Sequence, residues 1–120
     1  MSLKVLIVDD HPTFRSFAKN LLESEGFEVI GESEDGASAV DSIADLEPDL
    51  VLLDVQLPDL TGFEVAQKLR DQGVETPIVL TSSRDASAYG DQVETSPTIG
   101  FIPKADLSGD AIKRLLEAGP

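Results

Sequence analysis

Hydrophobic and polar positions along the chain follow two alternating patterns. Continuous hydrophobic runs rich in β-branched residues are typical of strands buried on both faces, and hydrophobic residues spaced three or four apart are typical of amphipathic helices. The strand pattern occurs at Leu3–Asp9, Phe27–Gly31, Asp49–Leu53, Pro77–Thr81 and Thr98–Pro103. Each of these segments is followed by one with the helical pattern.

The helical segments begin and end at residues that favour helix ends. Pro12 suits the first turn of a helix, and Gly26 and Gly73 close the first and third segments. The expected inward faces are Phe14, Phe17, Ala18, Leu21 and Leu22; Ala39, Val40, Ile43 and Ala44; Phe63, Ala66, Leu69 and Arg70; and, in the segment that begins at Ser108, Ala111, Ile112, Leu115 and Leu116. A fourth segment, Asp85–Val93, contains Gly90 and many Ser, Asp and Thr residues, so we expect a frayed element there.

This alternation of strand and helix predicts an α/β fold with a (βα)₅ arrangement, in which a doubly wound, parallel five-stranded sheet carries helices on both faces. Ligands of such sheets bind at the carboxyl ends of the strands. Candidate functional residues should therefore be sought in the loops that follow the strands.

Length and composition predict one domain over residues 1–120, because 120 residues is close to the usual size of a single domain. The chain has no cysteine, which excludes disulfides, zinc thiolate sites and thiol nucleophiles. No apolar run approaches the ~20 residues of a membrane span, and the first residues lack a signal-peptide pattern. We expect a cytoplasmic protein that does not enter a membrane.

The charge balance argues against nucleic-acid binding by this domain. Nine Lys and Arg residues stand against 23 Asp and Glu residues, giving a formal net charge of −14. Most of this surface would repel a phosphate backbone. Most of the acids are interpreted as a solvated shell that favours solubility.

Polar residues occupy four of the predicted strand ends. They are Asp9 and Asp10, Asp54, Thr81 with Ser82 and Ser83, and Lys104. Each has an ordinary explanation when taken alone, such as capping a helix or closing a strand. Their joint occurrence at one edge of one sheet favours a common site.

Three carboxylates in one crevice require a cation, because each close pair repels by about 4 kcal/mol at about 4 Å and an effective dielectric constant near 20. Oxygen ligands alone favour a hard cation such as Mg²⁺, which also accepts phosphate oxygens. Asp54 could act as a nucleophile toward phosphorus and form an acyl phosphate. Lys104 and the Thr81 hydroxyl could then bind phosphoryl oxygens.

With these residues in place, the whole chain resembles the receiver domains of bacterial two-component response regulators. The matching segments, in order, are Val8–Pro12, Leu52–Pro58, Thr61–Gly62, Val79–Ser82 and Phe101–Lys104. The resemblance implies the flavodoxin-like strand order 2-1-3-4-5.

The resemblance also implies a function. A sensor histidine kinase or phosphotransfer protein would donate a phosphoryl group to Asp54, with Mg²⁺ held by Asp10, Asp54 and the carbonyl of Gln56, and by Asp9 through water. The protein would catalyse only its own phosphotransfer and dephosphorylation and would not be an enzyme otherwise.

Further roles follow from the same resemblance. Thr81 and Lys104 would bind the phosphoryl oxygens, and Thr81 and Phe101 would switch the face formed by the fourth helix, fifth strand and fifth helix. Gln56 and Ser83 would set the lifetime of the phosphate. That face would control a helix-turn-helix output domain, transcription or a phosphorylation-dependent homodimer.

Some residues depart from the family pattern. Ala105 follows Lys104 where many receivers have proline, as in the branch joined to helix-turn-helix output domains. Thr95–Gly100 replaces the usual alanine-rich end of the fourth helix, which together with Gly90 suggests a shortened or mobile signalling element. Phe101 lacks the hydroxyl of a tyrosine and could be simply a half-buried core residue. His11 is interpreted as a surface residue beside the first helix and not as a ligand.

Three other functions share parts of this pattern. A flavodoxin-type carrier would need a Ser, Thr and Gly loop after the first strand, where two acids stand instead. A phosphatase with an aspartate nucleophile would need a second acid two residues on, where Gln56 stands. A docking module that is never phosphorylated would not require the acids, Thr81 and Lys104.

Overall fold

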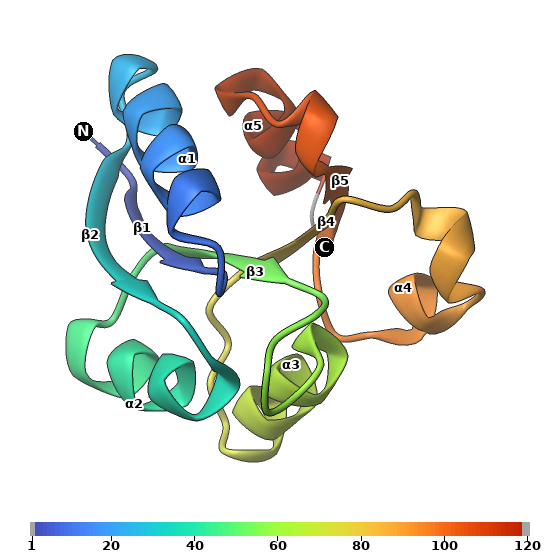
Figure 1. Cartoon of the computed structure of the whole chain (residues 1–120). Coiled ribbons are helices and arrows are strands. Elements are labelled where there is room, and N and C mark those ends of the chain that lie inside the picture. The colour runs from blue at the N-terminus through green and yellow to red at the C-terminus, as the bar shows by residue number, and fades with distance from the viewer. Residues whose placement is uncertain (1, 119–120) are drawn as a thin grey trace.

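A computed structural model of the chain describes residues 2–118. The two ends of the predicted domain, residues 1 and 119–120, lie outside the described residues. Five parallel strands form one sheet in the order β2-β1-β3-β4-β5, as expected (Figure 1). Their bounds are Lys4–Val8 for β1, Glu28–Ser33 for β2, Leu50–Asp54 for β3, Ile78–Ser82 for β4 and Gly100–Pro103 for β5.

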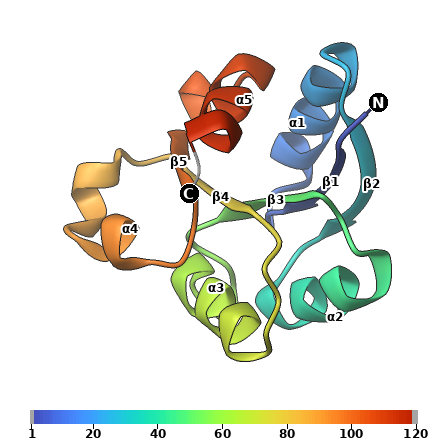
Figure 2. The same cartoon turned by 180° about the vertical axis from the view of Figure 1, so that it is seen from behind.

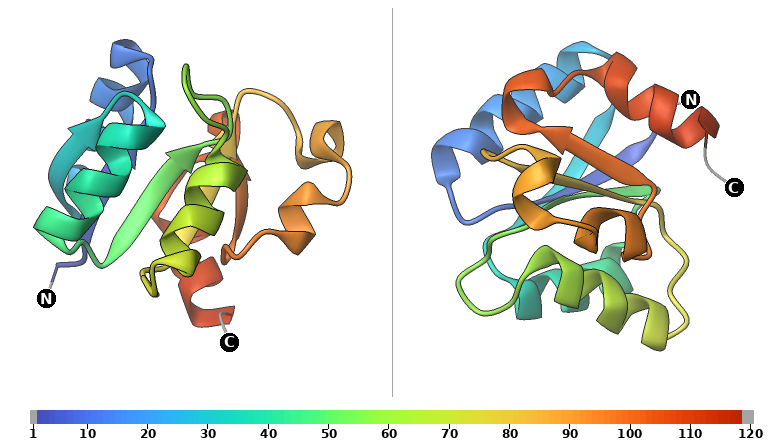
Figure 3. Two further views of the ribbon diagram at one scale, coloured as in Figure 1. Left: turned by 90° about the horizontal axis from the view of Figure 1, so that it is seen from below. Right: turned by 90° about the vertical axis from the view of Figure 1, so that its right-hand side faces the viewer.

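Helices cover both faces of the sheet, which confirms the predicted α/β class. Helices α1 and α5 lie on one face, and α2 and α3 lie side by side on the other (Figures 1 and 3). Their bounds are Pro12–Ser24 for α1, Gly36–Leu46 for α2, Gly62–Asp71 for α3, Gln92–Thr95 for α4 and Gly109–Ala118 for α5. Two 3₁₀ turns, Ala86–Tyr89 and Lys104–Asp106, complete the described elements.

Successive residues of the central strands point into the two helical layers in turn. On β1, Leu6 and Val8 pack with α2 and α3, and Val5 and Ile7 pack with α1 and α5. All four side chains are buried. A strand covered on both sides needs hydrophobic residues at every position, which explains why β1 and β3 were recognisable as continuous hydrophobic runs.

Some predicted boundaries and faces were wrong. The second strand begins and ends later than Phe27–Gly31, because Phe27 packs into the core just before the strand pairs with β1. The fifth strand, Gly100–Pro103, is shorter than Thr98–Pro103. The side chain of Phe17 is 54% exposed, and Ala44 is also exposed. In each case the neighbouring residue in the sequence is buried instead, Ala18 beside Phe17 and Ile43 beside Ala44. Neighbouring residues of a helix point in directions about 100° apart.

The expected frayed element is observed between β4 and β5. The segment consists of the 3₁₀ turn and the four-residue α4, and no residue of either is buried. It lies beside the β5 edge of the sheet (Figure 2). Tyr89 attaches it to the body of the protein, because its ring packs edge-on to Phe63 at 5.7 Å and its hydroxyl is hydrogen-bonded to Ser82 Oγ at 2.5 Å.

Two local features fix the loop that follows β3. A β-carbon at Gly62 would lie 2.5 Å from the carbonyl oxygen of Asp54, so only glycine fits at the start of α3. Thr61 and Glu64 form a reciprocal capping box on that helix. Asp59 accepts hydrogen bonds from the amides of Gly36 and Ala37 at 2.7 and 3.0 Å and so ties the loop to the start of α2.

Among residues 2–118, no helix combines the length and the hydrophobicity that crossing a membrane would require.

Candidate functional site

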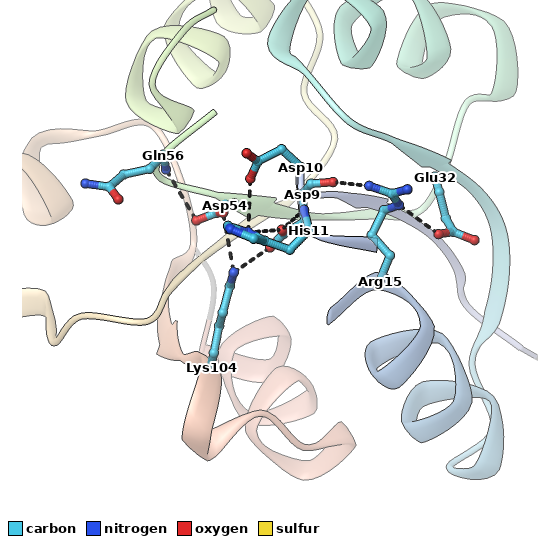
Figure 4. A network of polar contacts seen from close by, with 8 residues as sticks. All are labelled: Asp9, Asp10, His11, Arg15, Glu32, Asp54, Gln56 and Lys104. Atoms are coloured by element: carbon cyan, nitrogen blue, oxygen red, sulfur yellow. Dashed lines mark hydrogen bonds and ion pairs between the residues drawn. The ribbon is translucent and has the colours of Figure 1, made fainter. Parts of the chain in front are cut away.

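Three carboxylates meet at the carboxyl edge of the sheet (Figure 4). Asp9 and Asp10 follow β1, and Asp54 is the last residue of β3. Asp9 is fully buried and Asp54 is 3% exposed, whereas Asp10 lies at the surface. The parallel arrangement of adjacent strands brings these acids together, because β1 and β3 end side by side.

Lys104 supplies a positive charge between the two buried acids. Its ammonium nitrogen lies 2.7 Å from Asp9 Oδ2 and 3.4 Å from Asp54 Oδ2. The same nitrogen lies 4.4 Å from the ring centroid of Phe14, which adds a cation–π contact. The Lys104 side chain is only 16% exposed, so these interactions are weakly screened by water.

His11 lies on the solvent-exposed side of the acidic cluster and contacts Asp9 and Asp10. Its Nδ1 is 3.1 Å from both Asp9 Oδ1 and Asp10 Oδ1, and its backbone amide donates to Asp9 Oδ1 at 2.8 Å. The side chain is 67% exposed, which confirms its predicted place at the surface. The residue stands at the start of α1 but makes no side-chain cap there.

The pKa of Asp54 is raised to about 6, from an ordinary value of 3.8, chiefly because the carboxyl group is buried. The negative charge of Asp9 contributes to this rise, and Lys104 and the backbone amide of Gln56 oppose it. The Gln56 amide donates to Asp54 Oδ1 at 3.3 Å. A carboxylate at this position would therefore be stabilised by a further cation.

Thr81 stands beside Asp54 on the neighbouring strand. The two residues are register partners between β3 and β4. The Thr81 side chain is fully buried, and its hydroxyl has no hydrogen-bond partner among residues 2–118. A buried hydroxyl without a partner costs free energy, so this one is suited to an acceptor brought by a ligand.

The remaining predicted site residues lie around this centre. Gln56 follows Asp54, with its side chain exposed, and Ser83 is exposed just after β4. Phe101 is half-buried on β5, and its ring lies 6.1 Å from the ring of Tyr89. Contacts thus link Asp9, Asp54 and Lys104 directly and Asp10 through His11, whereas Ser83 and Phe101 lie outside that cluster.

Two residues near the site were not predicted from the sequence. Arg15 on α1 donates to the backbone carbonyl of Asp9 at 2.7 Å (Figure 4). Tyr89 is hydrogen-bonded to Ser82, the residue after Thr81. Neither contact could be predicted from a sequence pattern, because each joins residues that belong to different structural elements or loops. The position of Tyr89 as the single tyrosine, in an otherwise polar segment, was the only available hint.

The residues present fit a magnesium ion. One ligand atom from each of Asp9, Asp10, His11 and Asp54 can be chosen so that all lie within 4.8 Å of one another. The three acids supply oxygen atoms, which Mg²⁺ prefers, and Thr81 is the register partner of Asp54 on the neighbouring strand. The edge of the sheet therefore combines carboxylates that could hold a cation with a lysine and a buried hydroxyl.

Comparisons with known proteins agree with this geometry. Residues 5–116 match the family model of the response regulator receiver domain. The chain is 37% identical to the virulence transcription regulator BvgA of Bordetella pertussis over 84% of this chain and 48% of that protein. It is 31% identical to the DNA-binding transcriptional activator EvgA of Escherichia coli K12 over 87% of this chain and 51% of that protein.

A solved structure of a receiver domain has the same fold as this chain. The signal receiver domain of NarL from Mycobacterium tuberculosis superposes with a TM-score of 0.85 at 32% identity, covering 98% of this chain and 95% of that one. The fold and the acidic edge define a parallel α/β domain of the signal-receiver class. The chain belongs to the response regulator receiver domain family. It spans about half the length of the curated relatives that it matches.

Replacing Asp54 by Asn is expected to stabilise the metal-free protein more at pH 7.5 than at pH 5. The folded protein holds the Asp54 proton up to a pKa of about 6, and the unfolded chain releases it near 3.8. Ionisation of Asp54 therefore costs stability as the pH rises through this window. The full cost above pH 6 is on the order of 1–3 kcal/mol. Urea unfolding of both proteins in EDTA measures the difference.

Asp59→Asn is the matched control for this prediction. Hydrogen bonds from the Gly36 and Ala37 amides hold the pKa of Asp59 below 3.8. That carboxylate is therefore ionised in both folded and unfolded protein above pH 5, and its replacement should change stability equally at both pH values. A gain from Asp54→Asn that is equal at the two pH values, or larger at pH 5, would contradict the interpretation of Asp54.

Proposed function

We propose that this domain accepts a phosphoryl group on Asp54 with the aid of Mg²⁺. The observation that carries the proposal is the buried Asp54 carboxylate, which lies 3.4 Å from the Lys104 ammonium and is the register partner of Thr81, a residue whose buried hydroxyl is unpartnered among residues 2–118. Relatives that match this chain are transcription regulators, which supports a signalling role. We further propose that residues 1–120 form one receiver domain of a longer regulator.

The proposed reaction is a displacement at phosphorus. An oxygen of Asp54 attacks, forming a carboxyl–phosphate bond. The bond from phosphorus to the donor breaks, and the leaving group, the imidazole of a phosphohistidine or the acetate of acetyl phosphate, takes the electron pair. When bound, Mg²⁺ would be held by Asp10, Asp54 and the carbonyl of Gln56, and by Asp9 through water, and would offset the negative charges.

Lys104 and Thr81 would bind the transferred group. The Lys104 ammonium already lies within 3.4 Å of Asp54 and needs little movement to reach an oxygen attached to it. The Thr81 hydroxyl gains its missing hydrogen bond from the same group. Both contacts form only after transfer, so they favour the phosphorylated state.

The donor would be a sensor histidine kinase or a phosphotransfer protein. The output would be a helix-turn-helix domain, outside this chain, that controls transcription, with homodimerisation as a further response. The acidic surface is consistent with DNA contact by that output domain and not by this one, since the formal net charge is −14.

The switch would run from Thr81 to the β5 edge. Thr81 is followed directly by Ser82, whose hydroxyl is bonded to Tyr89, and the Tyr89 ring lies between Phe63 and Phe101. A turn of Thr81 toward phosphate would disturb this aromatic group. The surface that it supports, formed by α4, β5 and α5, would then change shape.

Incubation with acetyl phosphate and Mg²⁺ should add one phosphoryl group, about 80 Da in intact mass. The reason is that Asp54 is the nucleophile next to both the cation site and Lys104. Asp54→Ala should abolish the gain, and Asp45→Ala, which replaces an exposed acid on α2, should leave it unchanged. No gain in the wild-type protein would favour a docking module that is never phosphorylated, and label on another residue would refute Asp54 as the acceptor.

The lifetime of the phosphate should depend on Gln56 and Ser83. Both side chains are exposed, Gln56 two residues after the acceptor and Ser83 just after β4, and we propose that they hinder or guide an attacking water molecule. After removal of the donor, the decay of the added mass should differ at least twofold between wild type and Gln56→Ala, and likewise for Ser83→Ala. Equal decay rates in all three proteins would remove both residues from this role.

Phosphorylation should change the fluorescence of Tyr89. The protein has one tyrosine and no tryptophan, so the signal comes from Tyr89 alone. Its hydroxyl contact with Ser82 and its packing on Phe101 both set the emission. Asp54→Ala treated in the same way provides the baseline, and an identical signal before and after phosphorylation would argue against a switch through this ring.

A further inference from the structure

A continuous set of contacts leads from the edge strand β2 through α1 to the acidic cluster. Arg15 Nε donates to Glu32 Oε1 at 3.0 Å, and Arg15 Nη1 donates to the carbonyl oxygen of Asp9 at 2.7 Å (Figure 4). The Arg15 side chain is 17% exposed. The guanidinium is therefore largely shielded from water and is hydrogen-bonded to both Glu32 and Asp9.

The carbonyl that Arg15 binds belongs to the peptide group between the two acids. The Asp9 amide donates to the Ser33 carbonyl at 3.0 Å, and the His11 amide donates to Asp9 Oδ1 at 2.8 Å. Because a peptide group is planar, holding this carbonyl oxygen fixes the direction in which the chain enters Asp10. Arg15 thus adds to the hydrogen bonds that fix the Asp9 carboxylate and the backbone that leads into Asp10.

We propose that Arg15 is a positioning residue for the cation-binding acids and that Glu32 acts through it. The inference rests on the proposed function, in which Asp9 and Asp10 help to hold Mg²⁺. Arg15 would act on the backbone of the acidic turn and not on the metal itself. Residues that orient metal ligands in this indirect way commonly change metal affinity by about 10–100-fold when they are replaced.

The charge of Arg15 predicts the opposite effect from its hydrogen bonds. A guanidinium near a cation site repels the incoming cation, so its removal would by charge alone tighten Mg²⁺ binding. Loss of an orienting hydrogen bond would weaken Mg²⁺ binding instead. The sign of the change in affinity therefore separates the two roles.

Isothermal titration of the whole chain with MgCl₂ tests the proposal. Arg15→Gln should bind Mg²⁺ about tenfold more weakly than wild type. Arg15→Lys keeps the positive charge but replaces the planar guanidinium, which has several donors, with a single ammonium group. This variant should therefore also bind Mg²⁺ several-fold more weakly than wild type. Unchanged or tighter binding in Arg15→Gln would overturn the proposal.

Arg70→Gln is the matched control. Arg70 also bonds backbone carbonyls, those of Val74 and Thr76 at 2.6 and 3.1 Å, but it does so in the connection that leads into β4, at the opposite edge of the sheet. Its replacement removes a similar structural contact and should leave Mg²⁺ affinity unchanged. A loss of affinity equal to that of Arg15→Gln would mean that any lost arginine contact has this effect, and would overturn a specific role.

Glu32→Gln tests whether Glu32 affects Mg²⁺ binding only through its contact with Arg15. This variant should bind Mg²⁺ two- to tenfold more weakly in the wild-type background and cause no further loss in Arg15→Gln, because Glu32 acts only through the arginine. Equal losses in both backgrounds would show that Glu32 acts through its own charge, and would overturn that part of the proposal.

Amide hydrogen exchange in the metal-free protein separates this inference from the proposed function. The His11 amide, which is bonded to Asp9 Oδ1, should exchange faster in Arg15→Gln than in wild type or Arg70→Gln. Faster exchange would support the positioning role even if the wild-type protein failed to bind Mg²⁺, a result that would count against the proposed function. Exchange equal to that of wild type would overturn the positioning role.

Discussion

The ion pairs of Lys104 with two buried carboxylates are the interaction on which the rest of the site depends. Asp9 and Asp54 are almost completely removed from water, and their charges would repel each other without a cation between them. Lys104 reaches both, at 2.7 and 3.4 Å. Because the three residues come from the ends of β1, β3 and β5, this contact also ties together strands that are distant in the sequence.

The fold explains how such a cluster can form. Parallel strands end at one edge, and the helices on both faces keep water away from the strands but leave that edge accessible. Gly62 and Asp59 hold the loop after β3 close to Asp54 and to the start of α2. Asp54 is therefore rigidly placed, whereas the two short helical elements within residues 86–95, on the β5 side, contribute no buried residue to the core.

Much of the fold could be predicted from the sequence because parallel strands covered on both sides require uninterrupted hydrophobic runs. The strand-end residues could be found for a related reason, since polar residues directly after such runs must lie at one edge. The exposure of Phe17 could not be predicted, because a change of 100° in helix rotation leaves the spacing pattern nearly unaltered. The bonds of Arg15 to Asp9 and of Tyr89 to Ser82 depend on how separate elements pack, which spacing along the chain does not encode.

We infer that Lys104 takes the place of a cation at this site until Mg²⁺ and a phosphoryl group bind. A crystal structure with Mg²⁺ and beryllofluoride, an analogue of the phosphoryl group, tests it most directly. We expect the metal on Asp10, Asp54 and the Gln56 carbonyl, with the Lys104 ammonium moved from Asp9 to a fluoride on Asp54. A structure in which Lys104 stays on Asp9, with the metal bound away from these acids, would contradict the account.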